Sequence, residues 1–329
     1  MPQIEVDGLS MQYRVPVRPA GRLGALRGVV RRQVRTVDAL RDVNFSIEAG
    51  EMVGYIGPNG AGKSTTVKAL SGILTPTGGQ VSVLGRTPWH QRREHVAHIG
   101  VMFGQRTQLM WDLPVRDSFD LLQHIYRVEP DRYRQRLERL TDMLAISGTL
   151  LSQPVRQLSL GQRQRCDIAA ALLHSPSILF LDEPTLGLDA PSRLALRAFL
   201  KELNREEGLT VLLTTHDMDD IAALTGRVIF IAQGRLLFDG GFGELKRTAG
   251  AQRQLVLEDG AFPHCPLPAG AAWSDDDLPT VRFDPEQLSA GALLEALGHY
   301  GSPGQFRVEE GSVDEIIARL YARAAGGEA

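Results

Sequence analysis

A short apolar segment runs directly into a glycine-rich loop and then into a helical pattern. Residues 52–56 are apolar and bounded by turn residues, which predicts a buried strand. Gly57-Pro58-Asn59-Gly60-Ala61-Gly62-Lys63-Ser64 follows without a break, and a helix is predicted over residues 63–70. This order of strand, loop and helix predicts an α/β sheet with a phosphate-binding loop at the end of one strand.

The loop has the residue types that binding a nucleotide triphosphate requires. Its glycines let the backbone curl so that N–H groups point at phosphate oxygens. Lys63 can reach the β- and γ-phosphates, and the Ser64 hydroxyl can bind Mg²⁺. The residues predicted to contact ATP here are Gly57, Asn59, Gly60, Ala61, Gly62, Lys63, Ser64 and Thr65.

An Asp-Glu pair follows a second apolar segment, residues 178–181. Alone, Asp182 and Glu183 would be interpreted as a solvated strand end. Beside a phosphate loop, a carboxylate at the end of a buried strand predicts a second Mg²⁺ ligand, Asp182. Glu183 should point in a different direction, because side chains alternate along a strand. It is the candidate group that orients and deprotonates the attacking water.

Between these two motifs lies Leu158-Ser159-Leu160-Gly161-Gln162. This pentapeptide resembles the signature of ABC transporter ATP-binding subunits, with Leu160 where glycine is commonest. The resemblance extends from about residue 4 to residue 245. It implies that Ser159, Gly161 and Gln162 complete the ATP site of a second copy of the chain, so that ATP drives dimerisation.

Four further positions take their roles from this resemblance. Gln105 is similar to the glutamine that senses Mg²⁺ and the attacking water. Gly187-Leu188-Asp189 resembles the loop that crosses the dimer interface, with Asp189 near the nucleotide. His216 is similar to the switch histidine that contacts the γ-phosphate. Tyr13 is the candidate for stacking on adenine, and a core tyrosine is the alternative.

Alternating strands and helices predict an α/β fold. The resemblance implies a P-loop ABC ATPase core, a mixed sheet with a helical subdomain at about residues 105–174. We expect the ATP-binding domain to span residues 1–248. We expect residues 249–329 to form a small C-terminal α/β appendage, whose mixed helices and strands favour a dimerising or regulatory role over cargo binding. Strands are predicted there at 281–283 and 306–308.

Helices are predicted in the appendage at residues 289–297 and 313–322, and residues 262–279 show no periodicity. In the ATP-binding domain, the first two strands are predicted at residues 4–6 and 43–47.

Composition limits the partners of this chain. The net charge of −3 implies no general attraction to nucleic acid. The longest apolar runs fall far short of the ~20 residues of a membrane helix, and the N-terminus lacks a secretory pattern. Two widely separated cysteines fit a reducing compartment. We expect a peripheral protein on the cytoplasmic face of the cell membrane.

Residues 14–35 form a basic insert with seven arginines and no acidic residue. One interpretation is a basic amphipathic helix that contacts the membrane surface or a partner. A solvated loop is the other. A similar insert occurs in ATP-binding subunits of polysaccharide exporters.

Residues 101–114 resemble those of bacterial exporters of the type-two class, whose integral-membrane permease is a separate subunit. This resemblance implies a groove after Gln105 that receives the permease, with Trp111 and Leu113 either exposed there or packed against the helical subdomain. The cargo would be a drug, lipid or polymer, including a lipid-linked glycan.

A non-transport ABC ATPase that acts on DNA or ribosomes is a weaker alternative. The segment between the phosphate loop and the signature, residues 65–158, is too short for a long coiled coil, and only one cassette is present. A phosphate-loop kinase would leave the signature and His216 unexplained.

Overall fold

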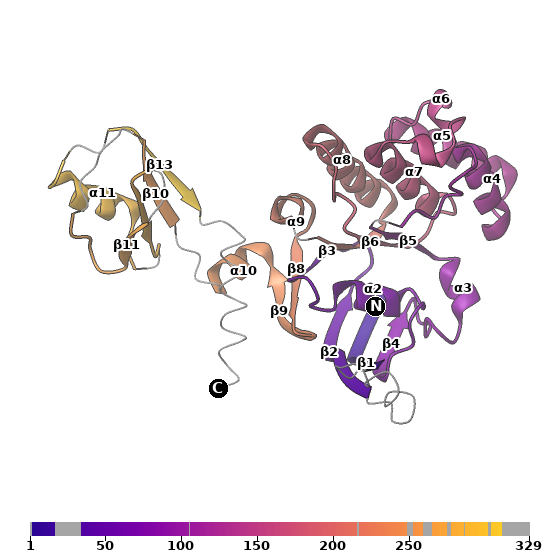
Figure 1. Ribbon diagram of the computed structural model, residues 1–329, viewed down its shortest axis with the longest axis horizontal. Helices are drawn as coiled ribbons and strands as arrows, with labels where there is room; N and C mark the ends of the chain where they lie inside the picture. The colour runs from indigo at the N-terminus through magenta and orange to yellow at the C-terminus, as the bar shows by residue number, and fades with distance from the viewer. Residues whose placement is uncertain are drawn as a thin grey trace, which may run out of the picture. The chain divides into compact units, whose positions relative to one another are not determined.

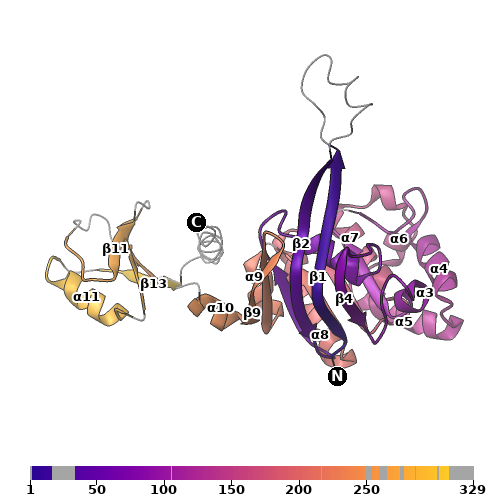
Figure 2. The same ribbon diagram turned by 90° about the horizontal axis from the view of Figure 1, so that it is seen from below.

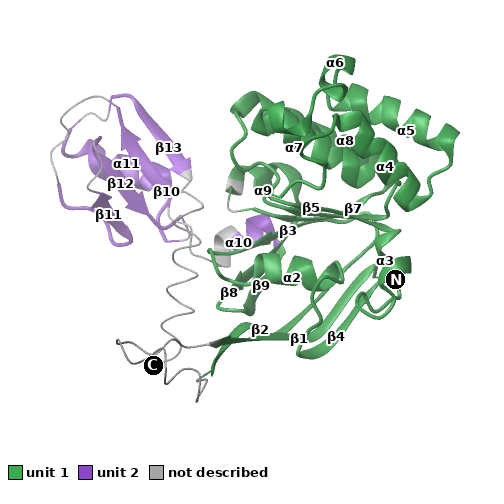
Figure 3. Cartoon of the chain, turned by 45° about the vertical axis from the view of Figure 1, so that its right-hand side comes forward, with its two compact units in different colours: residues 1–240 green, residues 241–329 purple. Residues whose placement is uncertain are grey.

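The computed structural model describes residues 2–16, 34–104, 106–215, 217–248, 253–258, 265–274, 278–285, 287–301 and 304–310. The chain divides into two compact units, residues 1–240 and 241–329 (Figure 3). Gln105, His216, most of the basic insert and the expected helix at 313–322 lie outside the described residues.

A six-stranded sheet forms the centre of the first unit, in the order β5-β6-β7-β3-β8-β9. The strands are β5 (Ile99–Phe103), β6 (Ile178–Asp182), β7 (Thr210–Thr214), β3 (Met52–Ile56), β8 (Arg227–Ala232) and β9 (Arg235–Gly241). From β5 to β8 all neighbours are parallel. The carboxyl ends of β3, β7 and β6 therefore lie next to one another, which brings together the loops that follow them.

Helices cover both faces of this sheet. Figure 3 shows α7 (Leu160–Leu172) and α8 (Ala190–Glu207) on one face and α2 (Lys63–Leu70) on the other. The remaining helices of this unit are α3 (Arg92–Val96), α4 (Val115–Tyr126), α5 (Pro130–Met143), α6 (Gly148–Leu151), the 3₁₀ helix η1 (Val155–Gln157) and α9 (Met218–Leu224). Val67 and Leu70 of α2 are fully buried, and each such side chain contributes about 1.5–3 kcal/mol relative to exposure.

A second, antiparallel sheet packs on the other side of α2, in the order β2-β1-β4 (Figure 1). Its strands are β1 (Ile4–Pro16), β2 (Val34–Ile47) and β4 (Gly78–Val83). The predicted strands at 4–6 and 43–47 were too short. Pairing between β1 and β2 continues to Pro16 and Val34, through three register shifts, so both ends of the basic insert belong to a long two-stranded ribbon (Figure 2).

The second unit begins with α10 (Phe242–Thr248). Its described part also contains the antiparallel sheet β11-β12-β10-β13 and a second helix, α11 (Ala290–Gly298). The strands are β11 (Ala271–Ser274), β12 (Thr280–Phe283), β10 (Arg253–Leu257) and β13 (Phe306–Glu310). Leu293 and Leu297 of α11 pack with Val281 and Phe283 in a small core. β11 falls within residues 262–279, where the sequence shows no periodicity.

Among the described residues, no helix combines the length and the apolar character that crossing a bilayer requires.

Candidate functional site

The glycine loop curls over the end of β3 because two of its glycines lie against other parts of the chain. A Cβ on Gly57 would lie 2.0 Å from the carbonyl oxygen of Ile231. A Cβ on Gly62 would lie 2.6 Å from Leu40 Cδ2, and its φ of 115° is in the region that favours glycine. At these two positions, therefore, only a glycine fits.

Helix α2 begins directly after this loop without a side-chain cap. Its N-cap residue is Gly62, which has no side chain that could cap the first N–H groups. The N–H groups in the first turn of a helix have no partner within the helix, and the helix dipole adds partial positive charge there. The start of α2 is therefore suited to bind an anion.

Lys63 lies inside the curl of the loop. Its ammonium donates to the carbonyl oxygens of Gly57 (2.6 Å) and Pro58 (3.2 Å), and only 6% of the residue is exposed. Burial lowers the pKa of Lys63, and the carboxylates of Glu183 and Asp182 oppose this shift. A buried cation beside two carboxylates would be further neutralised by a bound phosphate.

Asp182 connects three elements through one carboxylate oxygen. Its Oδ1 accepts hydrogen bonds from Ser64 Oγ (3.1 Å) at the start of α2 and from Thr214 Oγ1 (2.5 Å) at the end of β7. Asp182 and Thr214 are paired in the parallel ladder. The sequence predicted Ser64 and Asp182 as partners, but it did not identify Thr214, because the order of β6 and β7 in the sheet is not visible in the chain.

Glu183 leaves the strand in an unusual backbone conformation. Its φ is 54°, in the left-handed region that non-glycine residues rarely adopt and that costs about 1–3 kcal/mol. Its N–H donates to the Thr214 carbonyl oxygen (2.9 Å) and also lies 3.2 Å from Thr214 Oγ1. Thr214 thus holds both Asp182 and the backbone of Glu183.

These residues fit a magnesium nucleotide. A serine hydroxyl and a carboxylate, already 3.1 Å apart, are hard oxygen ligands of the kind Mg²⁺ prefers. Mg²⁺ commonly takes only one or two protein carboxylates and completes its shell with phosphate oxygens and water. Ser64 and Asp182 would supply the protein's part of that shell.

The signature residues form the start of a second helix. Ser159 is the N-cap of α7, where its hydroxyl oxygen accepts from the N–H of Gln162 (3.2 Å). The Gln162 side chain accepts in turn from the N–H of Ser159 (2.9 Å). This reciprocal capping box leaves the Ser159 hydroxyl proton and the Gly161 N–H without a partner in the helix. The start of α7 can therefore also bind an anion.

Leu160, the departure from the family pattern, packs against Gly187. A Cβ on Gly187 would lie 2.5 Å from Leu160 Cδ2, and a Cβ on Gly161 would lie 3.3 Å from Leu188 Cδ2. The two segments fit together because each presents a glycine to a leucine of the other. Among the described residues, no hydrogen bond or ion pair joins this signature group to the loop at residues 57–65.

Asp189 and Tyr13 have different surroundings. Asp189 is the N-cap of α8, and hydrogen bonds from Ser192 hold its pKa below the usual value. Tyr13 lies on β1 opposite Val37 of β2 and is 38% exposed, so it is not a core residue. Gln105 lies outside the described residues, and the segment that follows it is described from Arg106 onward.

That segment is fixed to α7 by a buried carboxylate that sequence reasoning did not identify. Asp167 Oδ1 accepts from Thr107 Oγ1 (2.8 Å) and from the N–H of Gln108 (3.0 Å), and the residue is 4% exposed. Burial raises its pKa to about 6, although Thr107, Gln108 and Arg163 oppose the shift. A lone acid within the apolar run at residues 166–173 was the signal available in the sequence.

A groove of about 290 Å³ opens beside this contact. Its lining includes Arg106, Thr107, Gln108, Tyr126 and Asp167. Apolar side chains nearby in sequence are exposed: Met110 to 44%, Trp111 to 50% and Leu113 to 45%. Trp111 and Leu113 are thus not buried against the helical subdomain.

The raised pKa of Asp167 gives a testable pH dependence. Because the folded state binds this proton more tightly than the unfolded chain does, Asp167 favours folding at low pH, and this contribution is lost as pH rises through about 6. Asp167→Asn removes the titration but keeps an oxygen at Oδ1. We expect the free energy of unfolding of the wild type, minus that of Asp167→Asn, to fall by about 1–2 kcal/mol between pH 5 and 7.5. Urea unfolding at both pH values measures this difference, and a constant difference would contradict it.

Comparisons with known proteins agree with this geometry. The family model for ABC transporters matches residues 40–186. The ABC transporter ATP-binding protein NatA of Bacillus subtilis is 35% identical over 211 residues, 64% of this chain and 85% of NatA. The methionine import ATP-binding protein MetN of Latilactobacillus sakei is 31% identical over 306 residues, 88% of this chain and 86% of MetN.

A solved structure has a similar fold. The dimeric, post-hydrolysis state of the ATP-binding cassette MJ0796, bound to ADP and Pi, superposes with a TM-score of 0.60 and 27% identity. The match covers 72% of this chain and 98% of that one. With a phosphate loop, a signature helix and relatives matched over most of their length, the chain belongs to the ATP-binding subunits of ABC transporters, a family of ATPases, and carries one nucleotide-binding domain.

Proposed function

We propose that two copies of this chain enclose two ATP molecules and that hydrolysis drives a separate membrane permease. One observation carries the proposal: a single chain presents two anion-binding helix starts, at α2 and at α7. Only the first lies beside the Ser64–Asp182 contact, where a metal nucleotide fits. The second is free to meet the nucleotide of another copy.

At the first helix start, the N–H groups of residues 60–65 bind the phosphates, and Lys63 neutralises their charge. Ser64 and Asp182 would hold Mg²⁺. When bound, the metal would stabilise the charge that develops on the transferred phosphoryl group. Lys63 has to exchange its two carbonyl partners, at Gly57 and Pro58, for phosphate oxygens. Tyr13, exposed on β1, stacks on adenine.

Glu183 is the proposed general base. Its carboxylate lies close enough to Lys63 to oppose the lowering of that residue's pKa, and its backbone is fixed by Thr214. It orients and deprotonates the attacking water. Gln105 and His216 complete the arrangement around the water and the γ-phosphate, as the family resemblance implies.

The second helix start completes the site of the partner copy. The Ser159 hydroxyl accepts one capping bond and keeps its proton, so it can donate to a phosphate oxygen. The Gly161 N–H can also donate to a phosphate oxygen. The Gln162 side chain holds the cap in place by accepting from the Ser159 N–H. Asp189, which caps α8, lies on the segment in contact with the signature. The dimeric form of the MJ0796 cassette with ADP and Pi supports this arrangement.

The permease binds at the groove beside residues 106–108. Exposed apolar side chains at Met110, Trp111 and Leu113 support this, because an apolar surface of this kind is typical of a binding site for another protein. The segment at 101–114 resembles that of type-two exporters, so we propose export of a drug, lipid or polymer. The chain would then work on the cytoplasmic face of the membrane, and residues 14–35 would contact the membrane surface.

Replacing Glu183 separates binding from hydrolysis. Glu183→Gln removes the base but keeps the size of the side chain, so we expect kcat to fall by about 100-fold or more with little change in ATP affinity. Phosphate release and equilibrium ATP binding measure the two effects. Glu202→Gln, an exposed position on α8, is the matched control. Hydrolysis at the wild-type rate in Glu183→Gln would remove the catalytic assignment.

Added charge tests the exposed apolar part of the proposed permease surface. Trp111→Glu combined with Leu113→Glu places two carboxylates on the proposed permease surface, and we expect co-purification with the permease to be lost while basal ATP hydrolysis by the isolated chain is kept. The permease in this test is an integral-membrane protein that co-purifies with the wild-type chain. Leu237→Glu changes an apolar residue of similar exposure (41%) elsewhere and should leave the complex intact. Equal recovery of permease with all variants would refute the assignment.

A further inference from the structure

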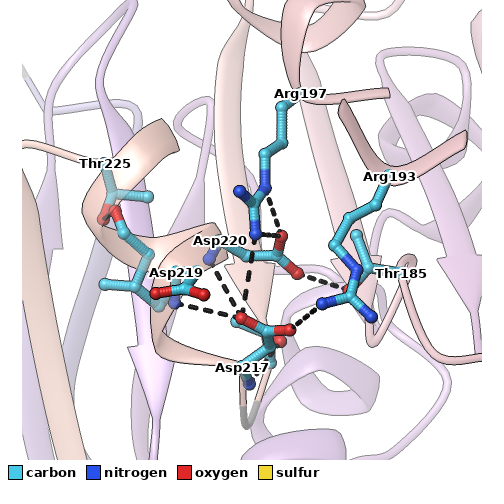
Figure 4. Close-up of polar contacts among 9 residues, drawn as sticks. Thr185, Arg193, Arg197, Asp217, Asp219, Asp220 and Thr225 are labelled. Atoms are coloured by element: carbon cyan, nitrogen blue, oxygen red, sulfur yellow. Dashed lines mark hydrogen bonds and ion pairs between the residues drawn. The ribbon is translucent and has the colours of Figure 1, made fainter. Parts of the chain in front are cut away.

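Two arginines of α8 face two aspartates at the start of α9 (Figure 4). Arg193 Nη1 lies 2.5 Å from Asp217 Oδ2. Arg197 Nη2 lies 2.5 Å from Asp220 Oδ1 and 3.8 Å from Asp217 Oδ1. The four charges therefore form one connected network between the two helices.

The centre of this network is a buried charge. The Asp220 side chain is completely buried, and its two oxygens have separate partners: Arg197 on Oδ1, and the Thr185 hydroxyl (2.5 Å) on Oδ2. A carboxylate in such a place is costly unless it is paired. Compared with apolar packing, a buried ion pair adds little stability, but its directional hydrogen bonds fix geometry.

The network reaches both loops that carry the proposed catalytic groups. Thr185 lies two residues after Glu183, on the loop that leaves β6. Asp217 lies three residues after Thr214, on the loop that leaves β7, and its N–H donates to the Thr215 hydroxyl (2.9 Å). Since Glu183 N–H also donates to Thr214, the two loops are joined at the strand ends and again at the network.

Asp217 also fixes the beginning of α9. Its Oδ1 accepts from the N–H groups of Asp219 (3.0 Å) and Asp220 (3.2 Å), while its Oδ2 is held by Arg193. One carboxylate thus caps α9 and connects it to α8. Arg193 therefore restrains the carboxylate that caps α9, and Arg197 restrains the carboxylate that holds Thr185.

We propose that Arg193 and Arg197 are positioning residues for ATP hydrolysis. Through Asp217, Asp220 and Thr185 they hold the β6 and β7 loops at a fixed separation, and this sets the place of the Glu183 carboxylate. The inference rests on the proposed role of Glu183 as the base. Neither arginine is expected to touch the nucleotide.

Arg197→Met should lower kcat by about 10- to 100-fold, because a small misplacement of a catalytic group has effects of that size. The KM for ATP and the ATP dissociation constant should stay within about twofold of the wild type. Arg197→Lys should recover part of kcat. Rates are compared per folded chain, with the folded fraction taken from thermal unfolding in the same buffer.

A non-additive pair gives the sharper test. In the Glu183→Gln background, Arg197→Met should cause no further loss of kcat, because the carboxylate that it positions is gone. If Arg197 had a purely structural role, Arg197→Met would lower kcat by the same factor in the wild type and in Glu183→Gln. If Arg197→Met does not fold, Arg193→Met replaces it, because the Arg193 side chain is 33% exposed and its loss is milder. Arg193→Met must then lower kcat in the wild type and have no effect on kcat in Glu183→Gln.

Arg139→Met is the matched control. Arg139 pairs with Glu206 (2.6 Å) and Glu207 (3.0 Å) at the other end of α8, so its loss removes an ion pair from the same helix. It should leave kcat unchanged. If Glu183→Gln abolishes hydrolysis while the arginine variants keep the wild-type kcat, the positioning role alone is refuted. If Glu183→Gln hydrolyses normally, the proposed function fails first.

Discussion

The arrangement of the first unit depends on a single carboxylate oxygen, Asp182 Oδ1. It accepts from Ser64 at the start of α2 and from Thr214 at the end of β7, while the Asp182 backbone ends β6. Helix, loop and two strands therefore meet at one atom. Because charged hydrogen bonds are stronger and more directional than neutral ones, this contact fixes Ser64 and Asp182, the proposed Mg²⁺ ligands, before any nucleotide binds.

The rest of the site is built from the N-termini of two helices. Both α2 and α7 present N–H groups where an anion can bind, but they differ in how they are capped. Gly62 leaves the start of α2 open, whereas Ser159 and Gln162 cap α7 and still leave a hydroxyl proton. Leu160 does not disturb this second start, because Gly187 makes room for it.

Local sequence predicted the parts of the site that depend on neighbours in the chain. Residues 52–56 and 63–70 formed the expected strand and helix, and Asp182 ended the expected strand. Contacts that depend on strand order were not predictable. Thr214 and the Asp220 network lie far in sequence from their partners, and the neighbouring positions of β6 and β7 in the sheet bring their loops together. Asp167 meets Thr107 and Gln108 because α7 packs against β5. The β1–β2 ribbon was underestimated for the same reason, since its length comes from pairing across the insert.

We propose that Ser159 of one copy completes the ATP site of another. Sedimentation of the Glu183→Gln variant with and without ATP tests it most directly, alongside the same variant carrying Ser159→Asp. Aspartate caps a helix as well as serine does, so α7 is kept, but its charge repels the γ-phosphate. We predict an ATP-dependent dimer for Glu183→Gln and a monomer for the double variant with unchanged ATP affinity. Equal dimerisation of both proteins, or no dimer in either, would contradict the claim.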